Sequence, residues 1–171
     1  NEQCIRPIST DSDLYTVKAT VDVATAATDD EIAKAFIRTV IKSRKEYKGS
    51  GSPTLFTTED VLTNCLLLED KNGRVIYDTV DKLATALRVK EIVTVEVMEG
   101  AKTKVSEQEK PLMAIMVNLA DYNVGADKGG AINMFDDFDI DYNQQKYLIE
   151  TRCSGALVKP YSAVAVALNK A

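Results

Sequence analysis

The chain has 171 residues, which is long enough for one domain with its own core. With 45% hydrophobic and 27% charged residues, its composition is that of an ordinary globular protein. Its formal net charge of -5 argues against a protein that grips the phosphate backbone of nucleic acid. The longest apolar runs, residues 112–117 and 163–168, are far shorter than the roughly 18 residues that a membrane-spanning helix needs. We therefore predict neither direct sequence-specific nucleic-acid binding nor a membrane span.

The first half of the chain predicts two strands and three helices. Residues 15–23 alternate apolar and polar side chains, as a half-buried strand does. Thr28 and Glu31 have the spacing of a capping box, and residues 32–41 repeat apolar side chains at helical intervals, so a helix should begin after Thr28. Two further helices are predicted at residues 58–69 and 79–87, with a short strand at residues 74–77 between them.

The second half of the chain predicts mostly strands, because its segments are rich in β-branched and other apolar residues. Strands are expected at residues 92–98, 112–119, 131–135, 147–157 and 162–168. Residues 101–110 are charged and lack periodicity, which predicts a mobile loop. The predicted fold class is α+β, with a mixed, largely antiparallel sheet flanked by helices, and residues 1–171 are expected to form a single domain.

The predicted core combines the apolar stripe of the first helix with later helices and strands. Its members are Ile32, Phe36, Ile37, Val40, Leu62, Leu66, Val95, Ile115 and Val117.

The absence of histidine limits the catalytic chemistry that this chain can perform. Ser-His-Asp and Cys-His catalysis and histidine-bearing zinc sites are excluded within it. Cys4, Cys65 and Cys153 are scattered and lack any close pairing, so they predict neither a disulfide framework nor a redox motif. They are interpreted as reduced cytosolic thiols, and Cys65 and Cys153, which lie in apolar patterns, as packing residues.

A cluster of carboxylates is the strongest candidate for a binding site, because such groups hold hard divalent cations. It consists of Asp136, Asp137, Asp139 and Asp141. Counted from Asp139, an EF-hand calcium loop would end at Glu150, but Gln144 stands where this loop requires glycine and Lys146 where it requires an apolar residue. A solvated acidic loop is therefore the preferred interpretation, with no metal, cofactor or catalytic residue assigned.

Two glycine-containing segments, residues 49–53 and 125–130, lack the full spacing of known phosphate-binding loops. We predict a flexible connector within the domain and a turn between strands, and Lys128 alone does not change this. The basic residues near the end of the first helix are explained by its dipole without an acidic partner. They are Lys42, Arg44, Lys45 and Lys48.

The end of the chain has a distinctive order of residues. Residues 147–168 contain an arginine, a small residue, an apolar pair and a proline before the last strand, held by Arg152, Gly155, Leu157, Val158, Pro160 and Ala163. This order resembles the closing segment of Hong Kong 97-like major capsid proteins of tailed phages, although Tyr161 and Ser162 place two residues rather than one between Pro160 and Ala163. Residues 53–98, with the turn from Asp70 to Arg74, and residues 119–135 are similar to that family in order and spacing.

The resemblance implies the axial domain of a capsid protein, which surrounds the centre of each hexamer or pentamer, with part of the peripheral domain. In that family an N-terminal arm, an extended loop and a spine helix come first, and none is identifiable here. Because the sequence begins at Asn1 rather than methionine, we expect a C-terminal fragment. The implied partners are copies of the same protein in hexamers and pentamers when full length, in a virion capsid assembled in the bacterial host cytoplasm.

The expected function is therefore structural and non-enzymatic: self-assembly into the icosahedral head shell of a phage or prophage. Contacts within such rings are heterologous, so one surface must fit a different surface of the neighbour. Residues 101–110 and 125–130 are the candidate contact segments. Two alternatives stay open, a divalent-metal-dependent enzyme that uses the Asp136 to Asp141 carboxylates and a soluble adaptor domain that binds another protein.

Overall fold

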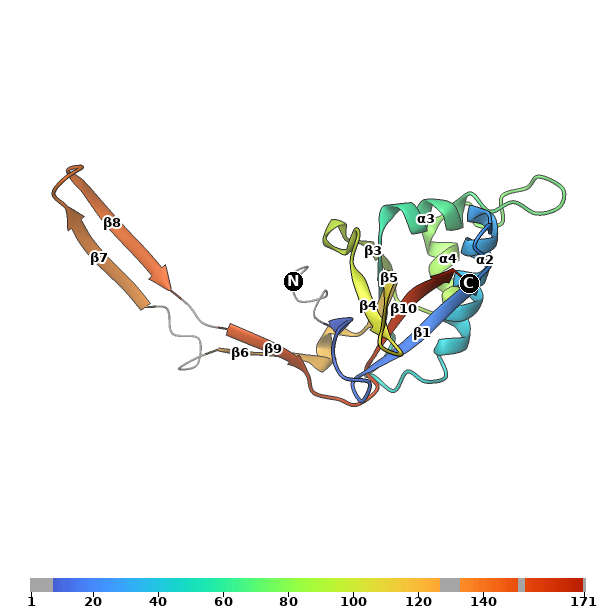
Figure 1. Cartoon of the computed structure of the whole chain (residues 1–171), viewed down its shortest axis with the longest axis horizontal. Coiled ribbons are helices and arrows are strands. Elements are labelled where there is room, and N and C mark those ends of the chain that lie inside the picture. Colours follow the sequence, from blue (N-terminus) through green and yellow to red (C-terminus); the bar gives the residue numbers. More distant parts are fainter. Residues whose placement is uncertain (1–7, 127–132, 151–152, 171) are drawn as a thin grey trace. The chain divides into compact units, whose positions relative to one another are not determined.

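The computed structural model describes residues 8–126, 133–150 and 153–170 of the chain (Figure 1). The chain divides into two compact units, one formed by Asn1–Asp121 with Leu157–Ala171 and the other by Tyr122–Ala156. No helix within the described ranges is long and apolar enough to cross a membrane.

The first unit is built on a six-stranded mixed sheet. Its strands are β1 (Thr16–Val23), β2 (Thr54–Thr57), β3 (Ile92–Thr94), β4 (Lys102–Val105), β5 (Gln108–Val117) and β10 (Ala163–Lys170). Their order is β1-β10-β5-β2-β3, with β4 paired to β5. β1 runs parallel to β10 and β2 parallel to β3, whereas the pairs made by β5 are antiparallel. The predicted α+β class with a mixed, largely antiparallel sheet is confirmed.

Three helices pack on one face of this sheet: α2 (Asp29–Ser43), α3 (Glu59–Leu66) and α4 (Val80–Leu87). The predicted capping residue Glu31 accepts a hydrogen bond from the Thr28 amide at 3.1 Å, so α2 begins where the sequence predicts. Phe36 and Val40 of α2 pack with Leu83 of α4 and with Met116 and Val166 of the sheet. Of the predicted core, Ile32 and Leu66 are only partly buried and the other members are buried.

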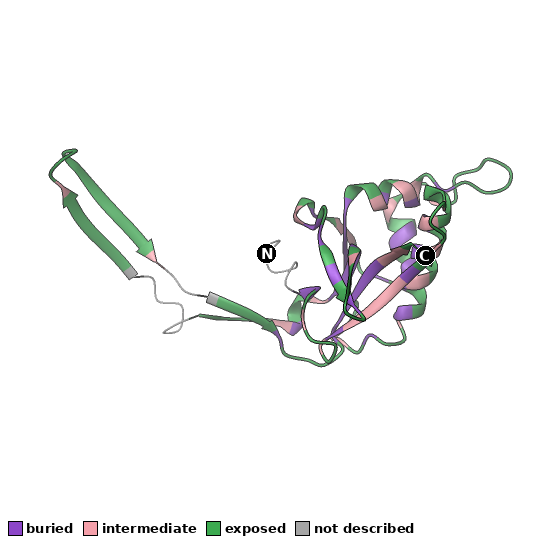
Figure 2. Cartoon of the chain, viewed as in Figure 1, coloured by how far each residue is buried: buried purple, intermediate pink, exposed green. Residues whose placement is uncertain are grey.

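The opposite face of the sheet is covered as well. Ala163, Ala165 and Ala167 of β10 and Ile115 of β5 are fully buried on that side. The Thr103 hydroxyl of β4 donates to the Ser9 carbonyl at 2.6 Å, and the Thr16 hydroxyl donates to the Ile8 carbonyl at 2.8 Å. These bonds attach the segment that begins at Ile8 to β4 and β1, so both faces of the sheet are covered, and Figure 2 shows the central strands of the sheet as buried.

The second unit contains two ribbons of two strands each. β6 (Tyr122–Ala126) pairs with β9 (Cys153–Leu157), and β7 (Asn133–Asp139) pairs with β8 (Gln144–Glu150) in an antiparallel hairpin. A Cβ atom at Gly155 would overlap the Tyr122 ring, so a larger residue at this position would require the ring to move.

The prediction of a mobile loop at residues 101–110 is wrong, because β4 and the start of β5 form a hairpin there. Thr103 and Val105 are buried while the lysines between them are exposed, which is the period-two pattern of a strand. Ser106 and Glu107 form the turn with φ angles of 50° and 67°. Tight hairpin turns of this kind normally carry glycine or asparagine, so the turn gave no sequence signal.

Other boundaries also differ from the prediction. Residues 74–77 form no strand, since Val75 makes only an isolated bridge with Glu69. The strand expected at residues 92–98 ends at Thr94 and is followed by a 3-10 turn, Glu96–Met98. Residues 147–157 belong to two strands, β8 and β9, because the chain changes partner between them.

Candidate assembly surface on an exposed hairpin

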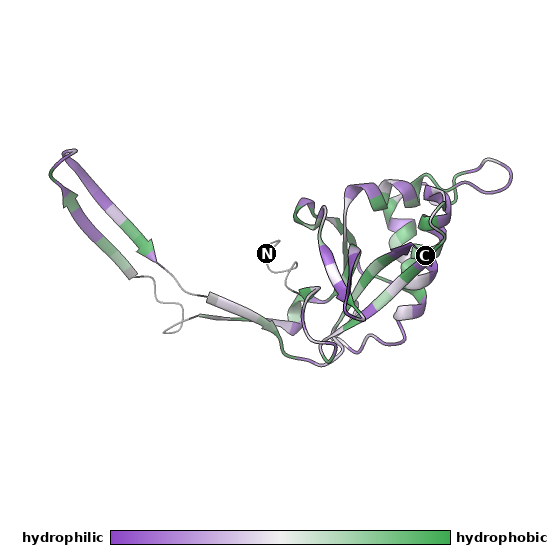
Figure 3. Cartoon of the chain, in the orientation of Figure 1, coloured by the Kyte–Doolittle hydropathy of each residue, from purple (hydrophilic) through white to green (hydrophobic). Residues whose placement is uncertain are grey.

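The β7–β8 hairpin exposes many large apolar side chains. They are between 51% and 83% exposed, and they are Met134, Phe135, Phe138, Ile140, Tyr142, Tyr147, Leu148 and Ile149. Figure 3 shows hydrophobic stretches on both strands of this hairpin. Contiguous exposed apolar residues mark interaction surfaces, because water-exposed apolar area is unfavourable when it could be buried.

The register of the hairpin places apolar pairs on both of its faces. Phe135 lies opposite Leu148, and Met134 lies opposite Ile149. Residues directly opposite share a face, and successive residues of a strand point to opposite faces. One face therefore carries the Phe135–Leu148 pair, and the other carries the Met134–Ile149 pair. An isolated two-stranded hairpin is at best marginally stable in water, so burial of these apolar pairs against a partner would stabilise this one.

The acidic cluster lies on this hairpin and not in a loop, which corrects the prediction. Asp136, Asp137 and Asp139 belong to β7, and Asp141 lies in the turn after it. Alternation along the strand points Asp136 to one face and Asp137 and Asp139 to the other. Lys146 of β8 forms an ion pair with Asp139. Asp136, Asp137 and Asp141 are exposed, whereas the Asp139 side chain is only 13% exposed, and the carboxylates do not converge on one point.

The EF-hand spacing also fails in space. Gln144 lies opposite Asp139, whereas Glu150 lies opposite Asn133 at the far end of the hairpin. Gln144 and Glu150 are six positions apart along the strand, which corresponds to about 20 Å at roughly 3.3 Å per residue. Asp139 and Glu150 therefore cannot share a calcium ion. Among the residues that the structure describes, no three acidic or cysteine side chains are grouped as a metal site requires.

Titration with calcium or magnesium is expected to show no tight site on the hairpin, because its carboxylates diverge and Lys146 neutralises Asp139. Isothermal calorimetry measures this directly, with Asp70→Asn, a change of an exposed aspartate in the first unit, as the control. A micromolar dissociation constant that disappears in Asp139→Asn but not in Asp70→Asn would show that the hairpin does bind metal.

Cys65 is the cysteine whose environment is defined. It is buried in the core of the first unit, and burial raises its pKa to about 12. A thiol with so high a pKa is not a nucleophile at neutral pH, so the packing interpretation of Cys65 is confirmed. Cys4 lies outside the described residues, and the side chain of Cys153 does too.

A buried carboxylate that the sequence did not single out holds the Gly-Ser segment at residues 49–53. Asp121 accepts hydrogen bonds from both the amide and the hydroxyl of Ser50, each at 2.6 Å. The side-chain amide of Asn118 donates to the Ser50 carbonyl. Burial, and then the charge of Asp121, raises the pKa of Tyr47, whose hydroxyl also donates to Ser50. The predicted flexible connector is therefore a loop held by hydrogen bonds.

Asp121 also lies where the chain leaves and re-enters the first unit. Its carbonyl accepts a hydrogen bond from the Val158 amide at 3.1 Å, and Tyr122 and Ala156 are the first and last residues of the second unit. Asp121 thus binds the Ser50 loop through its carboxylate and Val158 through its carbonyl. The two segments of the first unit that flank the second unit are therefore both linked to the Ser50 loop. No local motif predicts this role, because Ser50 and Asp121 are 71 residues apart.

Replacing Asp121 with alanine is expected to lower the free energy of unfolding by about 1 to 3 kcal/mol, because two Ser50 donors lose their acceptor. Urea denaturation measures the change. Asp136→Ala, at an exposed carboxylate, is the control and should stay within about 0.5 kcal/mol of the original protein. Equal stabilities for the two variants would show that the Ser50–Asp121 bonds add nothing.

The basic residues after α2 are engaged locally. The Arg44 guanidinium lies 4.9 Å from the centre of the Tyr47 ring, and the Lys48 ammonium lies 5.0 Å from the centre of the Tyr161 ring. Lys45 approaches Glu46 at 3.9 Å. These cation–π contacts and the ion pair give this cluster a packing role in addition to its place at the helix end.

The residues that carried the resemblance lie around β9 and β10. Leu157 is buried, Val158 is exposed, and Pro160 precedes Tyr161, which has a φ of 56° in the turn into Ala163. Arg152 lies outside the described residues, as do residues 127–130 of the candidate contact turn, including Lys128.

Solved structures that resemble this chain agree with one another in their fold. No family profile and no curated protein matches the sequence. The structure resembles the mature capsid of bacteriophage PhiM1 with a TM-score of 0.58 and 12% identity, covering 99% of this chain and 60% of that one. It resembles a phage-related protein from Bordetella bronchiseptica with a TM-score of 0.55 and 14% identity, covering 97% and 60%.

A virus-like particle from Pyrococcus furiosus gives a TM-score of 0.52 and 11% identity, covering 91% of this chain and 57% of that one. Identities this low show a shared fold and nothing more. The chain has the α+β fold found in phage capsid proteins, and it spans less than two thirds of the length of each of these three neighbours.

Proposed function

We propose that this chain is the C-terminal part of a Hong Kong 97-like major capsid protein of a tailed phage or prophage, and that it self-assembles into the icosahedral head shell. The observation that carries the proposal is the β7–β8 hairpin, which has an apolar pair on each face. A partner must supply the missing apolar contacts, and the capsid-like fold favours other copies of the same protein. The role is structural, and no catalytic residue is assigned.

The two units fit the parts of a capsid-type domain. We assign the first unit, with its sheet and three helices, to the axial domain around the centre of a capsomer. The second unit supplies the adjoining strands of the peripheral domain. About 40% of each of these neighbouring chains is unmatched, and we propose that in the full-length protein an arm, an extended loop and a spine helix precede this region.

The proposed partners are copies of the protein in hexamers and pentamers, in a virion capsid assembled in the cytoplasm of the bacterial host. Contacts within each ring are heterologous, so copies join head to tail until the ring closes. The net charge of -5 makes copies repel one another modestly, and salt screens this repulsion. Neither nucleic-acid sequence recognition nor a membrane contact forms part of the proposal.

Light scattering on two proteins tests this assignment. Residues 1–171 alone should be a monomer or a weak small oligomer at micromolar concentration, because stable interfaces bury at least about 1,000 Å² and the arm, loop and spine helix would supply much of that area. The product of the complete reading frame should form capsomers or shells. An adaptor domain would behave differently, because it would stay monomeric in both forms.

A further inference from the structure

The outer edge of β1 is a second surface that the first unit leaves open. β1 is an edge strand: it pairs with β10, and no described strand pairs with its other side. It is eight residues long, contains neither proline nor glycine, and keeps an unbroken register with β10 from Thr16 to Val23. Natural edge strands are usually short, bulged or interrupted by proline, because free edges add further strands. β1 has none of these three features, and its only charged residues are Lys18 and Asp22.

The direction of the free backbone groups follows from the ladder. The Tyr15 carbonyl accepts a hydrogen bond from the Ala163 amide, so Tyr15 faces β10. In a parallel pair, alternate residues direct both backbone groups to the same side. Val17, Ala19 and Val21 therefore bond to β10, and the amides and carbonyls of Lys18 and Thr20 point away from it.

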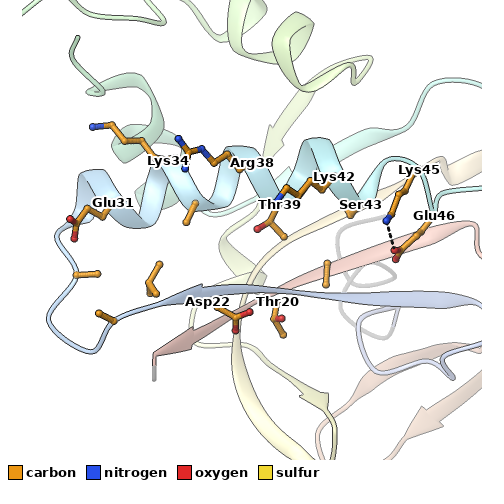
Figure 4. Close-up of a pocket in the computed structure, with 15 residues that line it drawn as sticks. Thr20, Asp22, Glu31, Lys34, Arg38, Thr39, Lys42, Ser43, Lys45 and Glu46 are labelled. Atoms are coloured by element: carbon orange, nitrogen blue, oxygen red, sulfur yellow. Dashed lines mark ion pairs between the residues drawn. The ribbon is translucent and has the colours of Figure 1, made fainter. Parts of the chain in front are cut away.

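A groove of about 710 Å³ lies along this edge, between β1 and α2 (Figure 4). Lys34, Arg38 and Lys42 line its helical side at intervals of four residues, so they form one cationic stripe on α2. None of the three forms an ion pair with another residue in the described part of the chain.

The acidic residues of the same groove already have partners. Glu31 accepts from the Thr28 amide at 3.1 Å, Asp22 accepts from the Asn169 side chain at 2.6 Å, and Glu46 lies 3.9 Å from Lys45. None of these carboxylates forms an ion pair with Lys34, Arg38 or Lys42, so the cationic stripe is available to a further acidic group, next to a row of free backbone groups. An acidic strand would supply negative charges to the stripe and hydrogen-bond partners to the free backbone groups of β1.

We propose that the outer edge of β7 from a second copy of the chain pairs with the free edge of β1, with its carboxylates directed to the cationic stripe. This inference rests on the proposed self-assembly and names one of its contacts. β7 has seven residues against eight in β1, and β8 is its partner on one side only. Backbone pairing at a sheet edge supplies affinity, and alternate side chains supply specificity.

Charge selects β7 over β8 as the added strand. β7 carries Asp136, Asp137 and Asp139 and no basic residue, whereas β8 carries one lysine, Lys146, and one glutamate, Glu150. Because Asp136 and Asp137 point to opposite faces, either orientation of β7 brings a carboxylate toward α2. Opposite charges favour such a contact and like charges oppose it, so the acidic β7 fits the cationic stripe better than β8 does.

A fluorescent peptide of residues 133–140 tests the contact by anisotropy with the whole 171-residue chain. Saturable binding is expected, and it should weaken at higher salt. A peptide with asparagine at the three aspartate positions of β7 and a peptide of residues 144–150 are the controls, and both should bind at least roughly tenfold more weakly. The absence of saturable binding up to about 1 mM peptide would overturn the proposal.

Two variants of the edge separate strand pairing from charge alone. Thr20→Pro removes an outward amide, a change that edge strands tolerate, whereas Thr20→Val keeps the amide. The peptide should bind Thr20→Val normally and Thr20→Pro at least roughly tenfold more weakly. Thermal melting checks that Thr20→Pro is folded, and if it is not, Arg38→Glu provides the second test and should weaken binding.

Equal binding by a folded Thr20→Pro variant would refute strand addition. If Thr20→Pro does not fold, equal binding by Arg38→Glu and the original chain would refute the contact. The result of the peptide test can be distinguished from the result of the assembly test. If shells form but the peptide does not bind, only the contact between β1 and β7 is refuted. Failure of the complete protein to assemble would instead refute the capsid assignment, whether or not the peptide binds.

Discussion

Replacing Phe36 with alanine is expected to lower the free energy of unfolding by about 3 to 5 kcal/mol. Phe36 is only 2% exposed and lies at the centre of the core that joins α2 to the sheet and to α4. The substitution removes buried apolar area and leaves a cavity that close-packed neighbours fill only partly. The effect is therefore larger than that of any surface change on the same helix.

Urea denaturation of Phe36→Ala is compared with that of Ile41→Ala, which truncates another apolar residue of α2. Ile41 is 43% exposed, so its loss should change stability by much less, about 1 kcal/mol or below. A change below about 1 kcal/mol for Phe36→Ala would mean that the buried stripe of α2 is not the core of this fold.

The second large effect is expected on assembly. Changing Phe135 and Leu148 together to serine removes the apolar pair from one face of the β7–β8 hairpin. Buried apolar anchors at the centre of an interface contribute about 2 kcal/mol or more each when truncated. Because every copy in a shell would lose this contact, light scattering on the complete protein should show that particle formation is abolished.

The matched control is Leu67→Ser, at an apolar residue of the first unit that is 63% exposed and thus similar to Leu148 at 61%. It should leave assembly unchanged. Both variants should keep the stability of the first unit, because neither change affects a buried core residue. Normal shells from the Phe135→Ser, Leu148→Ser protein would rule out this face of the hairpin as an assembly contact.

Elements with strong periodicity could be predicted from the sequence. The stripe of α2 and the start of the helix at its capping box follow from local side chains, and the alternation in residues 15–23 marks β1. The final strand and the buried part of β5 are continuous apolar runs, as expected for strands covered on both faces.

Features that depend on pairing or long-range contacts could not be predicted. The β4–β5 hairpin was missed because long charged side chains alternate with Thr103 and Val105, and its turn uses Ser106 and Glu107 in place of glycine. The bonds from Asp121 to Ser50 join distant segments, so no local pattern indicates them. In each case the sequence does not show which segment of the chain pairs with which other segment.

The acidic cluster shows the same limit at the candidate site. Its sequence spacing suggested either a metal loop or a solvated loop, whereas Asp136, Asp137 and Asp139 lie on a strand. The apolar residues next to them, Phe135 and Phe138, were the local signal for an exposed strand. Identifying the hairpin as a candidate assembly surface required its register, which places an apolar pair on each face.

Electron microscopy of the product of the complete reading frame that encodes this chain tests the central claim most directly. Closed icosahedral particles, or rings of five and six copies that precede them, are the predicted result. Separate monomers at every salt and protein concentration, also in the presence of the scaffolding or partner proteins encoded beside it, would contradict the proposal that this chain builds a capsid.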